Sequence, residues 1–200
     1  MIDDKFWKAL EKLDPFDVCQ RSLASLGKKE KTYRLPILNR IYLISPGEKI
    51  IFPENDPSSG PCEFYLQLSA INYLIGAKPV PLSNCWVSEK DFLGGSLFFR
   101  GIHSLPVSEL ERVFGRESRK FHRVSKACGG KEVKGGDLAY ELPMFPRLPV
   151  RILLWLEDKE FPARVLFLFD KTANIHLRLD GIWAVGKAIE RALLERASSP

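Results

Sequence analysis

Residues 152–170 read ILLWLEDKEFPARVLFLFD, two apolar runs on either side of an acidic tip. Continuous apolar runs of this kind are typical of strands that are buried on both faces of a sheet. The polar stretch between them ends at Pro162, which is typical of a turn. We therefore predict a hairpin of two core strands, 150–156 and 163–169, with Trp155 buried beside a helix at 62–76.

The rest of the chain alternates between helical and strand patterns. Asp14-Pro15 is typical of a helix cap followed by proline, so residues 1–27 are expected to form two helices. Three short strands are expected next, in TYRLPIL, RIYLIS and KIIFP. The other expected elements are a mostly buried helix at 62–76, a short strand at SLFFR, helices at 104–114 and 118–127, a strand at 137–142 and a last helix from Leu179.

This order of elements favours an α+β fold, because the strands cluster in two groups with helices between them. We predict a mostly antiparallel sheet of about six or seven strands covered by helices. Residues 1–200 are expected to form a single globular domain, with the helical segment 1–27 packed on it. A chain of 200 residues, of which 45% are hydrophobic, is long enough to bury a substantial core.

Several classes of protein do not fit the composition. No apolar run approaches the roughly 20 residues that span a bilayer, and the start, MIDDKFWKALEKL, lacks the apolar centre of a signal peptide. We therefore expect a cytoplasmic protein with no membrane partner. The net charge is +5, and basic residues gather between Arg112 and Lys134. The stretch lacks interleaved aromatics apart from Phe114 and Phe121, which favours a solvated helix face over a nucleic-acid site.

The cysteines and histidines do not show the spacing of a metal site. Cys19, Cys62, Cys85 and Cys128 are far apart in the sequence, whereas structural metal and iron–sulfur sites usually use closely spaced pairs. The three histidines are scattered and form no HExxH motif. We expect free or buried thiols and no metal site, and the sequence identifies no cofactor.

The stretch GGSLFFRGIH, residues 94–103, is the first candidate binding site. Gly94 and Gly95 would let backbone N–H groups approach an anion, and Arg100 offers a guanidinium for bidentate contact. His103 follows three residues after Arg100 and is the other side chain of this candidate site. Alternatively, His103 is a structural or helix-capping residue. The stretch matches neither the Walker loop nor the dinucleotide fingerprint.

Two aspartates at strand ends are further candidate ligand-binding residues. Asp170 ends the second hairpin strand, where it either binds a ligand or accepts hydrogen bonds from the N–H groups of Thr172 or Ala173. Asp137 follows a pair of glycines, where it either binds a ligand or fixes a local turn. The sequence leaves both readings open.

Asp158 and Glu160 at the hairpin tip are secondary candidates. They form either a solvated polar turn or a pair of carboxylates able to hold a hard cation. A seven-residue strand extends roughly 23 Å at about 3.3 Å per residue, so one small ligand does not bridge the tip and Asp170. We predict that Arg100 and His103 lie nearer Asp170 than Asp158.

Several phrases of the sequence resemble one known family. They are YRLPIL, WVSEKDFLGGSLFFRGIH, FGRESRKF, GGKEVKGGDLAYEL and PRLPVRILLWLEDKEFPARVLFLFD. Together they resemble an uncharacterised family of bacterial and archaeal proteins, mostly from anaerobes, known as domain of unknown function 3786. The resemblance runs from about Tyr33 to Leu179. Similar proteins are sometimes fused to a four-cysteine iron–sulfur domain, which implies work beside redox or one-carbon metabolism. This chain lacks that cysteine run, and the family has no established catalytic residues to carry over.

Two functions from different classes fit these observations. The first is a non-catalytic ligand-binding or accessory protein of anaerobic metalloenzyme, iron–sulfur or corrinoid metabolism, whose partner is a metalloenzyme, an iron–sulfur protein or a small molecule. The alternative is a small enzyme that uses an Asp/Arg/His cleft on a polar or anionic small molecule. An enzyme would bring two or more of the candidate side chains within hydrogen-bond reach. Because no nucleophile motif such as GxSxG occurs, the accessory function is the preferred hypothesis.

Overall fold

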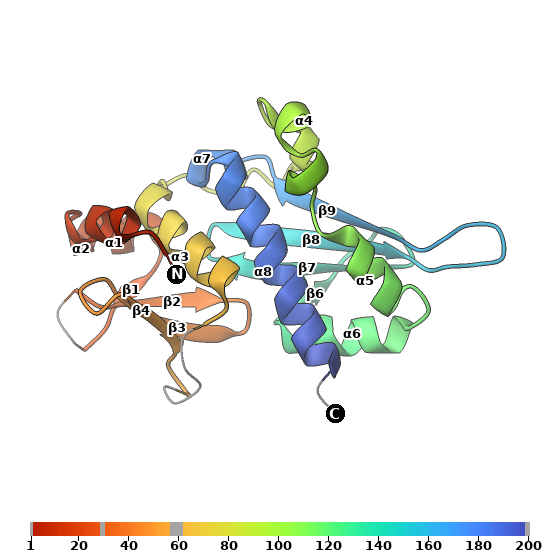
Figure 1. The fold of residues 1–200 in the computed structure, drawn as a ribbon, viewed down its shortest axis with the longest axis horizontal. Helices are drawn as coiled ribbons and strands as arrows, with labels where there is room; N and C mark the ends of the chain where they lie inside the picture. Colours follow the sequence, from red (N-terminus) through yellow and green to blue (C-terminus); the bar gives the residue numbers. More distant parts are fainter. Residues whose placement is uncertain (1, 29–30, 57–61, 199–200) are drawn as a thin grey trace.

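The computed structural model describes residues 2–28, 31–56 and 62–198. Figure 1 shows a small sheet and a large sheet side by side, with long helices between and in front of them. The small sheet has the order β1-β2-β3-β4 and contains β1 (Ser25–Leu26), β2 (Tyr33–Ile37), β3 (Arg40–Ser45) and β4 (Ile50–Pro53). The large sheet has the order β5-β9-β8-β7-β6 and contains β5 (Trp86–Val87), β6 (Lys131–Glu132), β7 (Leu138–Phe145), β8 (Leu148–Trp155) and β9 (Arg164–Asp170).

The helices connect these sheets and cover them. They are α1 (Asp4–Glu11), α2 (Pro15–Ser22), α3 (Phe64–Gly76), α4 (Gly95–Phe98), α5 (Val107–Phe114), α6 (Ser118–Ala127), α7 (Ala173–His176) and α8 (Leu179–Ser198), with short 3-10 turns η2 (Glu89–Asp91) and η3 (Gly101–His103). The α+β class and the antiparallel pairing are confirmed. The strands divide between two sheets, because α3 separates the first group of strands from the second.

The small sheet and the first two helices form the N-terminal part of the fold. The Asp14 side chain accepts a hydrogen bond from the N–H of Phe16 at 3.0 Å, which confirms the predicted cap of α2. This helix ends at Ser22, earlier than expected, because Leu23 adopts a left-handed φ of 58°. Both α1 and α2 pack on α3.

Helices α3 and α8 lie side by side, and α8 runs across the front of the large sheet in Figure 1. The sequence of α3 is apolar nearly all round, and the helix is buried on most sides as predicted. Its Tyr73 is fully buried and stacks on Phe145 of β7, with 4.4 Å between the ring centroids. This contact joins the central helix to the large sheet.

The predicted hairpin is confirmed, with a register that runs from Val150↔Phe169 to Trp155↔Arg164. Its burial is uneven, however. Val165 and Phe167 on one face belong to the core, whereas Leu166 and Leu168 on the opposite face are only half-buried. Leu153 on this second face is 9% exposed, so the second face is less completely buried than predicted.

Trp155 lies on this second, more open face, so the prediction of a core tryptophan beside α3 was wrong. Side chains alternate along a strand, and Trp155 shares its face with Leu153, whereas Leu154 points into the core. The Trp155 ring is half-buried and has the Arg164 guanidinium 5.4 Å from its centroid.

The stretch SLFFR is part of helix α4 and the turn that follows it, not a strand as predicted. The helix begins after Gly94, which has a φ of +78°, a conformation that favours glycine. At Gly95 a Cβ would lie only 2.1 Å from the carbonyl oxygen of Glu89. The two glycines therefore allow α4 to pack tightly against η2.

Candidate functional site

The Asp170 carboxylate is buried and holds together two loops. It accepts five hydrogen bonds: from the N–H and Oγ of Ser83 at 3.1 and 2.8 Å, from the N–H of Asn84 at 2.7 Å, and from the N–H and Oγ1 of Thr172 at 2.9 and 2.7 Å. The contact with Thr172 is the local cap that the sequence offered as one of two readings. These donors come from the segment before β5 and from the turn after β9, so Asp170 fixes both to the end of the sheet.

Arg100 and His103 make contacts within their own segment. Arg100 donates from Nε to the carbonyl of Ser96 at 2.6 Å. The His103 ring stacks on Phe98, with 4.6 Å between centroids, and meets Trp183 of α8 edge-on at 5.7 Å. No contact joins either side chain to Asp170 among the interactions of the described residues. The anion-binding role of Gly94, Gly95, Arg100 and His103 stays a prediction.

The placement of this segment relative to Asp170 is given by its neighbours. In Figure 1, α4 lies above β9 and away from the hairpin tip, which extends to the right. Phe98 lines a surface pocket of about 430 Å³ together with Asn174, four residues after Asp170. Phe99 and Ser104 line another with Arg164 and Phe167 of β9. The prediction that Arg100 and His103 lie nearer Asp170 than Asp158 therefore also stays open.

The structure does bring two of the predicted carboxylates together. Asp137 and Asp158 line one pocket of about 570 Å³ at the loop end of the β8–β9 hairpin, and Glu160 is not among its lining residues. Asp137 accepts a hydrogen bond at 2.8 Å from the N–H of Leu156. The local turn role of Asp158 is present, whereas Asp137 contacts the end of β8, 19 residues away, and its predicted turn role is not seen. Both side chains also line the shared pocket.

Asp158 is held at the hairpin tip by the backbone. Its Oδ1 accepts hydrogen bonds from the N–H groups of Glu160 and Phe161, each at 2.7 Å. These backbone donors lower the pKa of Asp158 below its ordinary value, because they stabilise the ionised form. The carboxylate is therefore negative at neutral pH.

A surface row of aromatic rings was not anticipated from the sequence. It consists of Phe64, Tyr65, Trp183, His103 and Phe98, with neighbouring centroids 4.6 to 5.7 Å apart. We call this the aromatic row. Because its members come from α3, α8, η3 and α4, no local sequence pattern predicts it.

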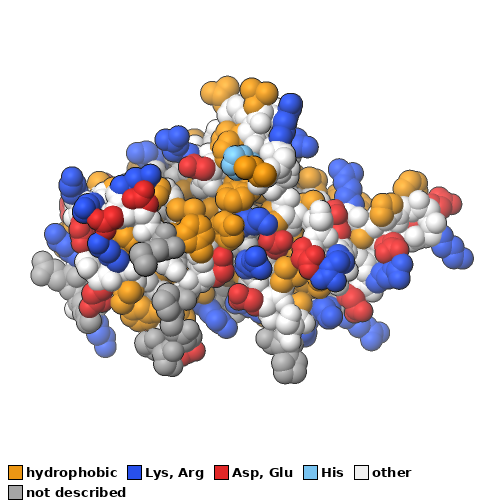
Figure 2. All heavy atoms as spheres, in the orientation of Figure 1, with side chains coloured by type: hydrophobic (Ala, Val, Ile, Leu, Met, Phe, Trp, Pro, Cys, Tyr) orange, Lys and Arg blue, Asp and Glu red, His pale blue; other side chains and the backbone are white. Residues whose placement is uncertain are grey.

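Exposed aliphatic side chains continue the aromatic row over α4. Leu93, Leu97 and Ile102, which we call the α4 patch, are 93%, 75% and 86% exposed. Figure 2 shows hydrophobic side chains at the outer end of α4 and in front of α3 and α8. Contiguous exposed apolar surface of this kind marks interaction sites.

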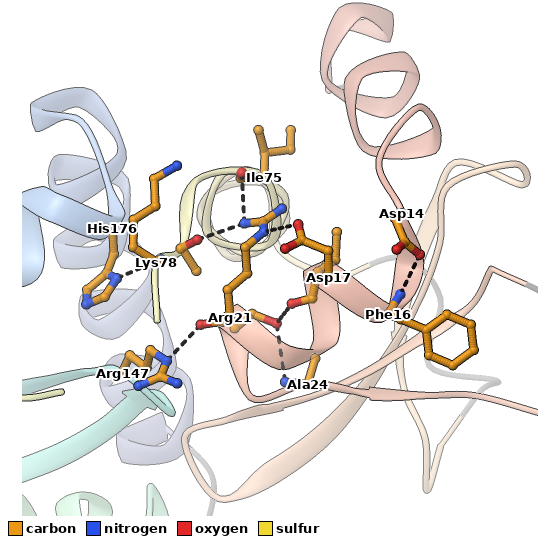
Figure 3. Close-up of polar contacts among 12 residues, drawn as sticks. Asp14, Phe16, Asp17, Arg21, Ala24, Ile75, Lys78, Arg147 and His176 are labelled. Atoms are coloured by element: carbon orange, nitrogen blue, oxygen red, sulfur yellow. Dashed lines mark hydrogen bonds and ion pairs between the residues drawn. The ribbon is translucent and has the colours of Figure 1, made fainter. Parts of the chain in front are cut away.

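A buried polar network joins the N-terminal part to the large sheet (Figure 3). From Nη1, Arg21 donates to the carbonyls of Ile75 and Ala77 at the end of α3, at 3.0 and 2.8 Å. A cation is favourable there, because the helix dipole places negative charge at its C-terminus. Arg147, in the β7–β8 turn, donates from Nε to the carbonyl of Arg21 at 2.7 Å. The two arginines therefore tie α2, α3 and the large sheet together.

His176 lies beside this network with one ring nitrogen unused. It is 2% exposed, and its Nδ1 accepts a hydrogen bond from the N–H of Lys78 at 3.2 Å, while Nε2 has no partner among the described residues. Burial lowers the pKa of His176 below its ordinary value, and the charge of Arg147 lowers it further, against an opposing effect of Asp170. The imidazole is therefore neutral at pH 7.

This environment predicts a loss of stability in mild acid. Since the folded-state pKa of His176 lies below the unfolded value of about 6.5, the unfolded chain binds the proton first, and the free energy of unfolding falls as the pH drops below about 6.5. We expect His176→Asn, which cannot be protonated and keeps an acceptor for the Lys78 N–H, to lose less stability than the parent between pH 7.5 and 5. Urea unfolding at each pH measures this, and equal losses in the two proteins would contradict it.

Metal ligands do not converge in the part of the chain that the structure describes. No group of three or more His, Cys, Asp or Glu side chains there is placed to hold a metal ion. The described cysteines are free thiols: Cys128 is buried, Cys19 and Cys62 are half-buried and Cys85 is exposed. Burial raises the pKa of the Cys62 thiol to about 12, so it is protonated at neutral pH. Among the described helices, none has the length and apolar character to cross a membrane.

The fold and these surfaces define an α+β protein of two antiparallel sheets with a pocket at the loop end of the β8–β9 hairpin and an exposed apolar surface. More particularly, the chain belongs to the family described as Domain of unknown function (DUF3786), whose model matches residues 14–192. The family resemblance inferred from the sequence is thus confirmed. No curated protein and no solved structure matched the chain.

Proposed function

We propose that the protein is a non-catalytic accessory protein that binds a metalloenzyme or iron–sulfur protein through the aromatic row and the α4 patch. The observation that carries this proposal is the exposure of Leu93, Leu97 and Ile102 next to five contiguous rings. Leaving large aliphatic side chains in water loses the stabilisation that burial would give, so a partner that covers them gains affinity.

The partner class rests on the family resemblance. Relatives fused to an iron–sulfur domain imply work beside redox centres, and we infer that this chain meets such a centre on a separate protein, in the cytoplasm of an anaerobe. The link to anaerobic metalloenzyme, iron–sulfur or corrinoid metabolism is part of the proposal.

A binding function is preferred to the small-enzyme alternative because of how the predicted cleft residues are used. The Asp170 carboxylate is occupied by five internal hydrogen bonds, and Arg100 is turned to the carbonyl of Ser96. His103 is part of the aromatic row. These contacts favour structural roles for Asp170 and Arg100, and they make His103 part of the proposed binding surface.

Site-specific photo-crosslinking in anaerobically grown cells of the native organism tests the proposal. A benzophenone amino acid is placed at Leu97 in the α4 patch or at Phe16 of α2, two apolar positions of similar exposure, 75% and 73%. We expect the Leu97 position, but not the Phe16 position, to give an adduct with a protein that mass spectrometry and metal analysis identify as a metalloenzyme, iron–sulfur or corrinoid protein. The double variant Leu97→Ser with Ile102→Ser should lose the complex while keeping the parent circular dichroism spectrum. Equal crosslinking at both positions, or an adduct with a protein that holds no metal centre, would overturn the proposal.

A further inference from the structure

The pocket at the loop end of the β8–β9 hairpin has its own chemistry, separate from the aromatic row. Its volume of about 570 Å³ lies within the range of small-molecule sites. Trp155, Phe161 and Pro162 supply apolar walls, and the Phe161 ring is 66% exposed although it is a large hydrophobic side chain. The pocket therefore presents aromatic surface to solvent.

Two fixed carboxylates lie in the same pocket. Asp137 is held through Oδ2 and Asp158 through Oδ1 by backbone N–H groups. In the described part of the chain, the second oxygen of each accepts no hydrogen bond. Because the backbone already holds both carboxylates in place, ordering these two side chains around a ligand costs little conformational entropy.

The protein already places a cation against one of the aromatic walls. The Arg164 guanidinium lies 5.4 Å from the centroid of the Trp155 ring, and Arg164 forms no ion pair with a carboxylate of the described residues. A ring face attracts a cation through its quadrupole. Arg164 therefore indicates which kind of group this aromatic surface accepts.

We propose that this pocket binds an organic cation, an alkylammonium or guanidinium group, which lies against Trp155 and Phe161 and pairs with Asp137 and Asp158. The ligand takes the place of the Arg164 side chain over the indole ring. An anion would instead face two carboxylates with one guanidinium to hold it. The same cationic group occurs on free amines and on lysine or arginine side chains of another protein, and the choice of probe distinguishes these sources.

Titration of the ¹⁵N-labelled full chain tests the proposal, with n-butylammonium and N-acetyl-lysine methylamide as the two probes. The indole N–H resonance of Trp155 is assigned through Trp155→Phe and followed in each titration. We expect a saturable shift with at least one probe, and the tighter of the two identifies the source. Asp158→Asn, which keeps an acceptor oxygen for the turn, should weaken binding about twofold to fivefold, as for an exposed ion pair. Arg164→Gln should strengthen binding by about the same factor, because it removes the internal competitor.

Glu160→Gln is the matched control, since it removes the same charge from the same tip but lies outside the pocket lining. Its affinity for either probe should equal that of the parent. The proposal fails if neither probe shifts the Trp155 resonance, if Glu160→Gln weakens binding as much as Asp158→Asn, or if Arg164→Gln weakens binding. It also fails if sodium acetate shifts the Trp155 resonance of the parent and not that of Arg164→Gln, because the pocket is then an anion site. The α4 patch takes no part in these titrations, so their outcome is independent of the proposed partner.

Discussion

Asp170→Ala is expected to lower the free energy of unfolding by about 3–5 kcal/mol, because it leaves the buried donors of Thr172 without an acceptor and removes the hydrogen bonds from the second loop. Ser83, Asn84 and Thr172 together donate five hydrogen bonds to this carboxylate, which is 1% exposed. Urea unfolding followed by far-ultraviolet circular dichroism measures the loss. A loss below about 1 kcal/mol, the median effect of a point substitution, would show that the carboxylate does not hold the two loops and is available for a ligand.

Asp158→Ala is the matched control for this substitution. It also removes a carboxylate that accepts backbone N–H groups, those of Glu160 and Phe161, but at an exposed position where water replaces the acceptor. We expect a loss of about 1 kcal/mol or less, as for an exposed cap. A loss as large as that of Asp170→Ala would contradict the distinction between the buried and the exposed end of the hairpin.

The contribution of Asp170 should also depend on pH in a defined direction. Burial opposes its ionisation, but hydrogen bonds from Thr172 and Ser83 outweigh burial and hold the pKa of Asp170 below the ordinary 3.8. The stabilisation from its charge is therefore fully present above about pH 4 and is lost as the pH falls through the lowered pKa.

Leu154→Ala should cost about 3–5 kcal/mol of unfolding free energy, whereas Leu166→Ala should cost about 1 kcal/mol. The two positions lie on neighbouring strands of one hairpin, and the substitution is the same. Leu154 is fully buried on the face toward the helices, so its removal leaves a cavity, whereas Leu166 is half-buried on the opposite face. Chemical denaturation of both variants gives the comparison.

Equal losses at these two positions would mean that both faces of the sheet are covered, as the sequence had led us to predict. The apolar run that contains Leu166 cannot distinguish one buried face from two, because leucine and phenylalanine occur on both. Only the position of α5 and α8 on one side decides which leucine belongs to the core.

Local signals in the sequence predicted much of the secondary structure. The apolar runs with Pro162 between them specified the hairpin, because alternating strand geometry and turn chemistry act over a few residues. Asp14-Pro15 specified the start of α2 for the same reason. The family was also recognisable from the phrases alone.

The errors arose where distant parts of the chain meet. SLFFR has a strand-like composition, but Gly95 packs on the Glu89 carbonyl and the segment becomes α4. Trp155 is as hydrophobic as any core residue, yet the strand register turns it to the open face. Propensity is a weak guide at such positions, since tertiary packing outweighs it.

By itself, the sequence determined the antiparallel hairpin, the cap of α2 and the identity of the candidate polar residues, because each depends on neighbours in the chain. Tertiary structure alone decided the use of those residues. It enclosed Asp170 among donors from two loops and placed Asp137 and Asp158 around one pocket. It also assembled the aromatic row from α3, α4, η3 and α8. Burial and side-chain proximity are properties of packed elements, and no single stretch of sequence contains them.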